Sequence, residues 1–436
     1  MLKKVSIIAG LVVVGLLFVL GIRAVVRRVS TPDKARQDKT ALDQRATPAD
    51  REIRAAQALI ERAPKLPVGY NRLASAYMQK ARETGDFGYN ARAEEALKHS
   101  FQAEPDNHDA TRLQAYLLLT YHRFGEALPV AQRAVAQSPK DYEAYGALVD
   151  ALVELGQYEE AKKAVQTMLD IRPYTASYAR ASYLRSLYGN TEGAIEAMRM
   201  AVESASPANP ENLAWCLIYL GDELMNAGRL DEAEREYDRA LFSFPDYHLA
   251  LAAKARARLA AGDTDNAIAF YKRAQERVPL PDTAIALGDL YTKLGRSAEA
   301  KQQYELVEFI ERTSAASGTY SRQLALFYAD HDIKLDEALA IAQREREARS
   351  DIYTSDALAW CLYKKGDLAG AKKSVDEALR LGTRDARMNF HAGMIYQALG
   401  ERGNATKHLQ LALKINPSFD VLQADVAKQT LRAITA

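Results

Sequence analysis

Apolar residues recur along this chain at the spacing of short amphipathic helices that come in pairs. In the clearest example, Tyr145, Leu148 and Leu152 fall on one helical face at the 3.6-residue period. Gly156 then provides a left-handed helix terminator, and a second helix runs on until Pro173 forbids its continuation. The pattern predicts a helix, a tight turn and a second helix.

The same unit returns about ten times, and an alanine in each second helix marks it. Consecutive marker alanines are 33 to 39 residues apart by subtraction, and they are Ala93, Ala127, Ala161, Ala194, Ala233, Ala267, Ala300, Ala338, Ala371 and Ala405. Most units carry another small residue seven places later, so two recesses per helix let neighbouring helices approach closely. Self-similarity at this period is typical of an array of stacked units.

This repeated sequence pattern resembles that of the tetratricopeptide repeat family, in which an aromatic-Leu-Gly/Ala-Tyr first helix precedes an Ala-aromatic-Ala-Pro second helix. The resemblance runs roughly from Pro67 to Phe419 and is strongest in units such as Tyr142–Pro173 and Ala386–Pro417. It implies an all-α fold, namely a right-handed α-solenoid of about ten helix-turn-helix repeats over residues 67–417.

Both ends of the array show the amphipathic helices that terminal units require. Thr47 and Pro48 form a helix start, and residues 50–66 are predicted to be an N-terminal capping helix. Residues 418–436 are predicted to be a C-terminal capping helix, amphipathic over Phe419–Ile434.

An apolar segment precedes the array. Val5–Ile22 holds eighteen residues without a charge, and the apolar character extends through Val26, which is enough to cross a bilayer core of roughly 30 Å. We therefore expect residues 1–29 to form a transmembrane or signal-anchor helix, with membrane contact through residues 5–26. Residues 30–49 would be a polar linker to the array.

A cleaved signal peptide, with export of the array, is the alternative. The long apolar region, the absence of a clean Ala-x-Ala site and the presence of Arg23, Arg27 and Arg28 favour an uncleaved anchor. The expected location is thus a single-pass inner or cell membrane of bacterial type. The excess of Lys and Arg after the span favours a cytoplasmic array, whereas the short basic N-terminus resembles signal anchors that leave the array outside, so its side stays open.

The net charge and the cysteine positions exclude further classes of partner and of covalent link. The formal net charge is +1, with Lys and Arg interspersed among Asp and Glu, so no nucleic-acid partner is expected. Cys216 and Cys361 lie in different units, too far apart along a solenoid for a disulfide.

Motifs for catalysis are missing from the sequence. It contains no phosphate-binding loop, His-Glu-x-x-His, Cys-x-x-Cys or Gly-x-Ser-x-Gly motif, and the seven histidines are dispersed. The cluster Asp330-His331-Asp332 falls in a predicted turn, where polar residues are the default. We therefore expect no enzyme activity, no cofactor, no metal and no small-molecule substrate.

The concave groove is the candidate functional surface, since first helices line the inner side of such a superhelix. Aromatic and polar residues gather there in the last three units, and aromatic rings are favoured binding anchors. The predicted partner-binding residues are Tyr320, Gln323, Phe327, Tyr353, Asp356, Trp360, Tyr363, Arg387, Phe390, Met394 and Gln397. Alternatively, several of them pack between adjacent first helices. A weaker second candidate comprises Trp215, Ile218, Asp222 and Met225.

The favoured hypothesis is a non-catalytic, membrane-tethered scaffold that binds a partner protein or peptide in this groove for complex assembly. The alternative is an accessory or regulatory subunit of an envelope-biogenesis or glycosyl-transfer system whose chemistry lies on another chain.

Overall fold

The computed structural model describes residues 47–315 and 322–436, and every regular element within them is a helix. In chain order these are α3 (Pro48–Arg62), α4 (Pro67–Thr84), α5 (Gly88–Ala103), α6 (His108–Thr120), α7 (Phe124–Gln137), α8 (Tyr142–Glu154), α9 (Tyr158–Ile171), α10 (Thr175–Leu187), α11 (Thr191–Ser204), α12 (Pro210–Asn226), α13 (Leu230–Ser243), α14 (His248–Ala260), α15 (Thr264–Arg277), α16 (Pro281–Lys293), α17 (Ser297–Ala315), α18 (Arg322–Asp330), α19 (Leu335–Ala348), α20 (Ile352–Lys364), α21 (Leu368–Ala378), the 3-10 turn η1 (Leu379–Leu381), α22 (Ala386–Ala398), α23 (Arg402–Ile415) and α24 (Gln423–Thr435).

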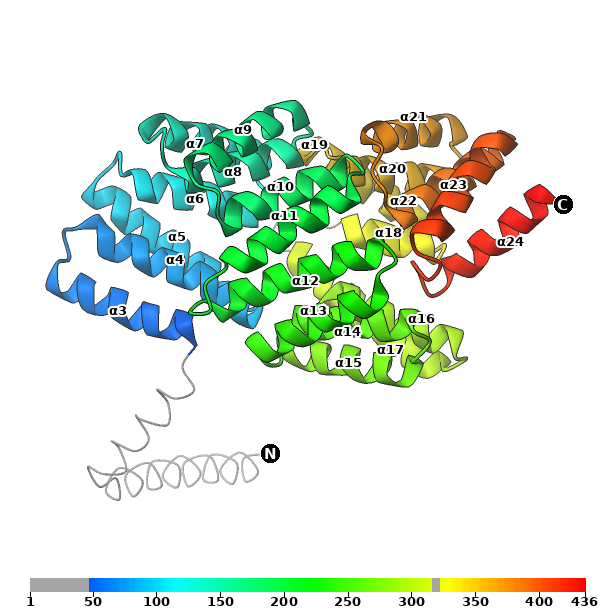
Figure 1. Cartoon of the computed structure of the whole chain (residues 1–436), viewed down its shortest axis with the longest axis horizontal. Coiled ribbons are helices and arrows are strands. Elements are labelled where there is room, and N and C mark those ends of the chain that lie inside the picture. The colour runs from blue at the N-terminus through cyan, green and yellow to red at the C-terminus, as the bar shows by residue number, and fades with distance from the viewer. Residues whose placement is uncertain (1–46, 316–321) are drawn as a thin grey trace, which may run out of the picture.

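The helices between α4 and α23 form ten hairpins, each made of an even-numbered first helix and an odd-numbered second helix (Figure 1). The two helices of a hairpin pack on each other, and successive hairpins stack side by side. α3 precedes the array and α24 follows it. The expected all-α solenoid of about ten units is therefore observed.

The marker alanines lie inside this packing. All ten are buried; nine are 0% exposed, and Ala300 is 4% exposed. A methyl side chain is the largest group that permits so close a helix contact, because protein interiors have little free volume. The period seen in the sequence is therefore the period of helix-to-helix contact.

Local chemistry sets where the helices begin and turn. Thr47 and Asp50 form the capping box at the start of α3, in agreement with the Thr47-Pro48 pattern. The hairpin turn at Gly156 has a φ of +69°. In the α18–α19 turn, which lacks glycine, Asp332 takes φ +54° instead, as a short polar side chain tolerates.

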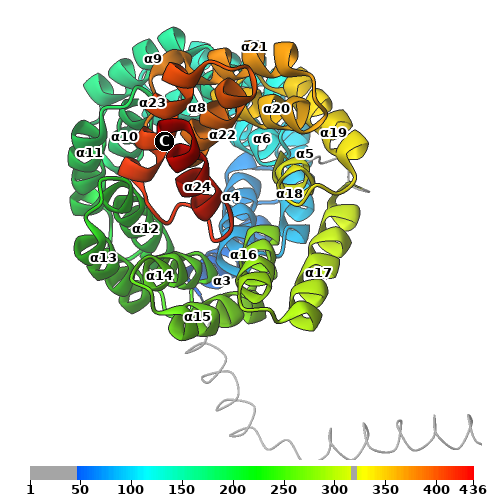
Figure 2. The ribbon, with the colours of Figure 1, turned by 90° about the vertical axis from the view of Figure 1, so that its right-hand side faces the viewer.

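Stacking bends the array into a ring when viewed along its long axis (Figure 2). The even-numbered helices form the inner ring and the odd-numbered helices the outer one, while α24 lies across the near opening. We call the side of the even-numbered helices that faces the centre the inner wall.

Repeats that lie one superhelical turn apart contact each other. The Ile352 amide donates to the Tyr158 hydroxyl at 2.9 Å, and the Thr383 hydroxyl donates to the Leu187 carbonyl. These partners lie 194 and 196 residues apart in the sequence. Successive turns of the superhelix therefore touch.

Two turn glycines make this contact possible. A Cβ added to Gly156 would lie 2.5 Å from the Ser350 carbonyl oxygen, and one added to Gly189 would lie 2.5 Å from the Gly382 carbonyl oxygen. Both glycines also have positive φ angles. They thus serve a hairpin turn and a turn-to-turn contact at once.

An ion cluster reinforces the same contact. The Arg349 side chain, 6% exposed, pairs with Glu345 and, at 3.2 Å, with Glu154 of the earlier turn. Its guanidinium also lies 5.4 Å from the centre of the Phe124 ring. Glu345 occupies the position of the second small residue of its repeat, so this unit replaces a packing recess with a cross-turn salt bridge.

The ends differ in part from expectation. The last helix begins at Gln423 and not near Phe419, because the Asp420 carboxylate caps the amides of Leu422 and Gln423. None of the described helices has the length and apolar character needed to cross a membrane. The predicted span, Val5–Ile22, and the linker up to residue 46 lie outside the described residues.

We predict that Arg349→Ala lowers the free energy of unfolding by about 3 kcal/mol, because it leaves two carboxylates without their buried cation. The matched control, Arg123→Ala, removes an exposed pair with Glu126 and should cost about 0.5 kcal/mol or less. Urea unfolding followed by circular dichroism measures both. Equal effects of the two substitutions would contradict a structural role for the turn-to-turn contact.

Candidate binding site on the inner wall

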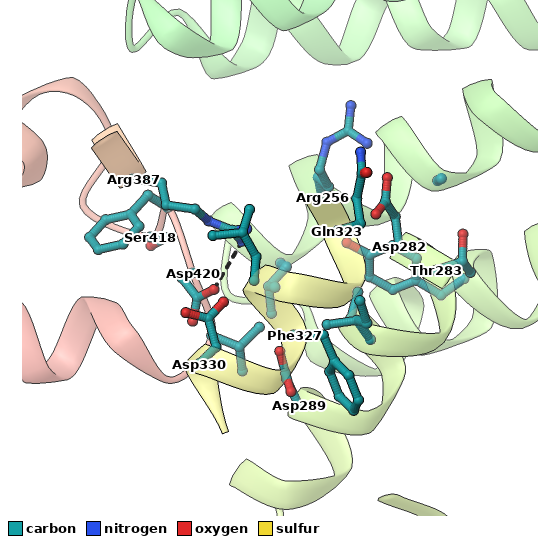
Figure 3. Close-up of a pocket in the computed structure, with 18 of the residues that line it drawn as sticks. Arg256, Asp282, Thr283, Asp289, Gln323, Phe327, Asp330, Arg387, Ser418 and Asp420 are labelled. Atoms are coloured by element: carbon teal, nitrogen blue, oxygen red, sulfur yellow. Dashed lines mark hydrogen bonds and ion pairs between the residues drawn. The ribbon is translucent and has the colours of Figure 1, made fainter. Parts of the chain in front are cut away.

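A cavity of about 390 Å³ opens on the inner wall; we call it the central cavity. Its walls come from α12, α14, α15, α16, α18 and α22, and from residue 416 and residues 418–421 ahead of α24. Figure 3 shows how side chains from these distant elements converge. A space of this size accommodates a few side chains of a ligand.

The cavity is strongly charged. Its charged lining residues are Arg256, Arg387, Asp282, Asp289, Asp330 and Asp420. Arg387 pairs with Asp420 at 3.2 Å, the dashed contact in Figure 3. Burial raises the pKa of Asp282, and the nearby Arg387 and Arg256 oppose that effect. The cavity therefore presents charged groups of both signs to a ligand, and Asp420 already neutralises Arg387.

Acid–base pairs link first helices of adjacent repeats along the inner wall. Each joins an aspartate of one first helix to a base on the next first helix or, for His331, directly after it. The pairs are Asp150–Arg180, Asp222–Arg256, Asp289–His331 and Asp356–His391. Three of these aspartates, in α8, α12 and α16, stand at the same offset before Ala161, Ala233 and Ala300. This shared offset is a signal in the sequence that points to the acid–base pairs. The predicted partner-binding residues were chosen without it.

The predicted turn cluster at residues 330–332 separates into three independent contacts. Asp330 accepts a hydrogen bond from the Trp360 indole at 2.7 Å, His331 Nε2 lies 2.8 Å from Asp289, and Asp332 pairs with Lys364. Burial opposes protonation of His331, but its hydrogen bond to Asp289 and that charge raise its pKa above the usual value. These groups hold helices together and do not converge on one reacting centre.

Three of the predicted aromatic anchors lie in the core. Phe327, Trp360 and Phe390 are 2%, 3% and 1% exposed. Trp360 stacks on His391 with ring centres 4.3 Å apart, and Phe390 contacts Phe419 at 5.4 Å. Trp360 and Phe390 pack between adjacent first helices, which is the alternative that the sequence left open, and Phe419 covers Phe390. Phe327 contacts Tyr304 of α17 and also lines the central cavity.

The other predicted residues take varied positions. Gln323 and Arg387 line the central cavity, and Asp356 is buried against His391. Half-buried residues of the set are Tyr353, Tyr363 and Met394, whereas Gln397 is exposed and Tyr320 lies outside the described residues. The inner wall therefore brings most of the set together, but its accessible part is polar.

The second predicted set lies across the same wall, on α12. Trp215 packs against Tyr219 with tilted rings whose centres are 4.1 Å apart, and Ile218 is buried. Asp222 accepts from Arg256 at 2.6 Å, and Met225 lines the central cavity. The set forms part of the cavity wall and of the acid–base pairs, so the two predicted groups border one space.

Two tyrosines of the inner wall were absent from both predicted sets. Tyr183 on α10 and Tyr219 on α12 are each 41% exposed. Surrounding protein nevertheless raises the pKa of Tyr183 well above its usual value, and Glu154 adds to this effect while Arg322 opposes it. A side chain that is exposed and yet enclosed lies in a narrow interior space, where it remains available to a ligand.

The described residues offer no group of three or more His, Cys, Asp or Glu that could hold a metal ion. Both cysteines are free and buried, and burial raises the pKa of each thiol to about 12. Neither thiol has the character of a nucleophile.

Sequence comparison places repeats of one kind along much of the chain. Models described as tetratricopeptide repeat match residues 118–182, then 78–142 and 220–280, and then 281–308 and 386–419. The matched stretches include hairpins that border the central cavity.

A curated relative is the human protein O-mannosyl-transferase TMTC1, which is 29% identical over 195 residues. The alignment covers 44% of this chain and 22% of the relative, so the chain spans under a quarter of that protein's length.

The chain is also similar to solved structures at low sequence identity. Human IFIT1 as a dimer with PPP-AAAA has a TM-score of 0.48 and 15% identity over 72% of this chain and 73% of that one. A thermophilic TPR protein of Thermus thermophilus has a TM-score of 0.38 and 20% identity over 43% and 99% of the two chains.

Glu223 on α12 is a half-buried acid that accepts a hydrogen bond from Ser186 at 3.2 Å. Burial raises its pKa to about 7, the charge of Asp222 adds to this, and the Ser186 bond opposes it. The unfolded chain ionises near pH 4.5, so the fold loses stability as the pH rises from there through about 7.

We predict that Glu223→Gln removes this loss. Relative to the variant, the native chain should lose about 1–2 kcal/mol between pH 5 and pH 8. Urea unfolding of both proteins at the two pH values measures the difference. A constant difference across this range would contradict the raised pKa.

Proposed function

Because the chain belongs to the tetratricopeptide repeat family, we propose that it is a non-catalytic scaffold that binds an extended segment of a partner protein on its inner wall. The observation that carries the proposal is the enclosed inner wall, with its central cavity and its exposed Tyr183 and Tyr219. Rigid aromatic side chains supply contact area at a small entropic cost, and the charged groups fix the register of a bound chain.

The geometry favours an extended segment over a helix. Turn-to-turn contacts close the sides of the superhelix, and the central cavity holds about 390 Å³. An α-helix with its side chains is about 10 Å across, whereas an extended chain is slimmer and leaves backbone amides free to pair with Asp282 or Gln323. The partner would therefore thread along the wall.

We further propose that residues 5–26 tether the scaffold to a bacterial-type inner or cell membrane. The support is the uncharged length of Val5–Ile22 and its basic flanks. Export after cleavage of a signal peptide is the competing possibility, and both sides of the membrane are compatible with the proposal.

A second candidate is an accessory subunit of an envelope-biogenesis or glycosyl-transfer system. The partial match to a protein O-mannosyl-transferase favours it. In that case the inner wall would hold a transferase or its protein substrate, with the chemistry on another chain.

Site-specific photo-crosslinking tests the scaffold. A photoreactive phenylalanine analogue at Tyr219 should give an adduct with one partner, because that side chain is exposed on the inner wall. The matched control is Phe242 on α13, which is 90% exposed on an outer helix and should give no such adduct. Mass spectrometry of the adduct identifies the partner; a transferase whose turnover the chain alters would favour the second candidate. The same partner captured equally at Phe242, or no adduct at Tyr219, would refute binding on the inner wall.

Alkaline carbonate extraction tests the tether. The full chain should stay in the membrane pellet, because a spanning helix resists extraction, and a chain that lacks residues 2–28 should be released. A control with Arg27 and Arg28 changed to Gln keeps the apolar span and should remain in the pellet. Release of the full chain would contradict an uncleaved anchor.

A further inference from the structure

The stretch from Asn416 to Asp425 enters the interior of the superhelix. It leaves α23, passes Phe390 and reaches α14 and α16 before α24 starts (Figure 2). The Phe419 ring lies 5.4 Å from that of Phe390, and Val421 packs against the core cluster that contains Leu287 and Leu290. We call residues 416–425 the crossing segment.

Polar contacts hold the crossing segment at both of its sides. The Asp420 carboxylate pairs with Arg387 of α22 at 3.2 Å, and its side chain is only 8% exposed. On the other side, the Lys293 ammonium donates to the Val421 carbonyl at 3.0 Å and pairs with Asp425 at 3.1 Å. Lys293 is 128 and 132 residues away from these partners in the sequence, so the segment bridges distant parts of the inner wall.

The crossing segment also divides the interior space. It contributes walls to the central cavity of about 390 Å³ and to neighbouring cavities of about 310 and 260 Å³. The first two share Arg387, Asn416 and Phe419 as lining residues. These cavities are thus the remainder of a larger space that the segment fills in part.

The segment has the form of a bound peptide. Residues 417–422 form turns and bends, not a helix. Three consecutive side chains make different contacts: Phe419 an aromatic one, Asp420 an ionic one and Val421 an aliphatic one. A bound peptide is recognised by the same combination, with charge fixing the register and apolar side chains filling recesses.

We propose that the crossing segment is a built-in occupant of the inner wall, and that the external partner is an extended peptide of the same chemistry, with an aromatic, an acidic and an aliphatic residue in succession. This rests on the proposed function, which it deepens by naming the class of partner segment. The partner displaces the crossing segment and takes over the contacts to Phe390, Arg387 and the α14–α16 cluster. An attached segment acts at an effective concentration in the millimolar range, so it competes strongly.

The test uses the full chain and a fluorescent peptide that carries residues 415–426. Phe419→Ala together with Asp420→Asn should free the crossing segment, since the first change removes the ring and the second removes the charge while keeping an oxygen for the cap of α24. Fluorescence anisotropy should then show at least tenfold tighter peptide binding than to the native chain. Adding Arg387→Ala should abolish the gain.

The matched control is Val426→Ala, a change on α24 at a side chain that is 41% exposed; it should leave binding as weak as in the native chain. Hydrogen exchange of residues 416–425 verifies that the double variant opens the segment.

An opened segment with no peptide binding would overturn the inference, and so would binding that survives Arg387→Ala. If the peptide does not bind while a partner still crosslinks at Tyr219, the scaffold function stands. Only the proposal that the crossing segment occupies the partner's site is then refuted. Peptide binding without a crosslinked partner would instead refute the scaffold function, while the proposal that the crossing segment occupies a peptide site on the inner wall would be supported.

Discussion

Each hairpin of this chain has apolar surface on two sides, and it can bury that surface only against the hairpins before and after it. The small residues at the contact points, led by alanines that are almost wholly buried, decide how near those neighbours come. Because the approach is close and repeated ten times, a slight rotation between units accumulates into a full superhelical turn. The position of every functional side chain follows from that accumulated rotation.

The rotation is large enough here that the chain meets itself. Gly156 and Gly189 fit against backbone of the following turn, and Arg349 joins Glu154 across the same boundary. Turn-to-turn contact converts a groove that would be open along its length into an enclosed interior. Side chains such as Tyr183 then remain exposed while protein surrounds them, which is why the tyrosine pKa rises so far.

The local part of this architecture could be predicted from the sequence, because it depends on neighbours within one or two repeats. The marker alanines, the glycine turns and the capping box at Thr47 all belong to that class. The inner wall was less predictable. Helical register places Phe327, Trp360 and Phe390 on the first helices, but only the pitch of the superhelix decides whether such rings face a space or a neighbour. Phe390 is covered by Phe419, a residue that the amphipathic pattern had assigned to the last helix.

The closure of one turn on the next is the claim from which the enclosed site follows, and a distance between spin labels measures it directly. Labels at Glu192→Cys and Arg384→Cys report on the boundary near Gly189, where Arg384 approaches the glycine, and the buried native thiols should stay unlabelled. Electron paramagnetic resonance should give one narrow distribution of short distances. A broad distribution at long distances would mean that successive turns of the superhelix do not touch, and it would contradict this account of the binding site.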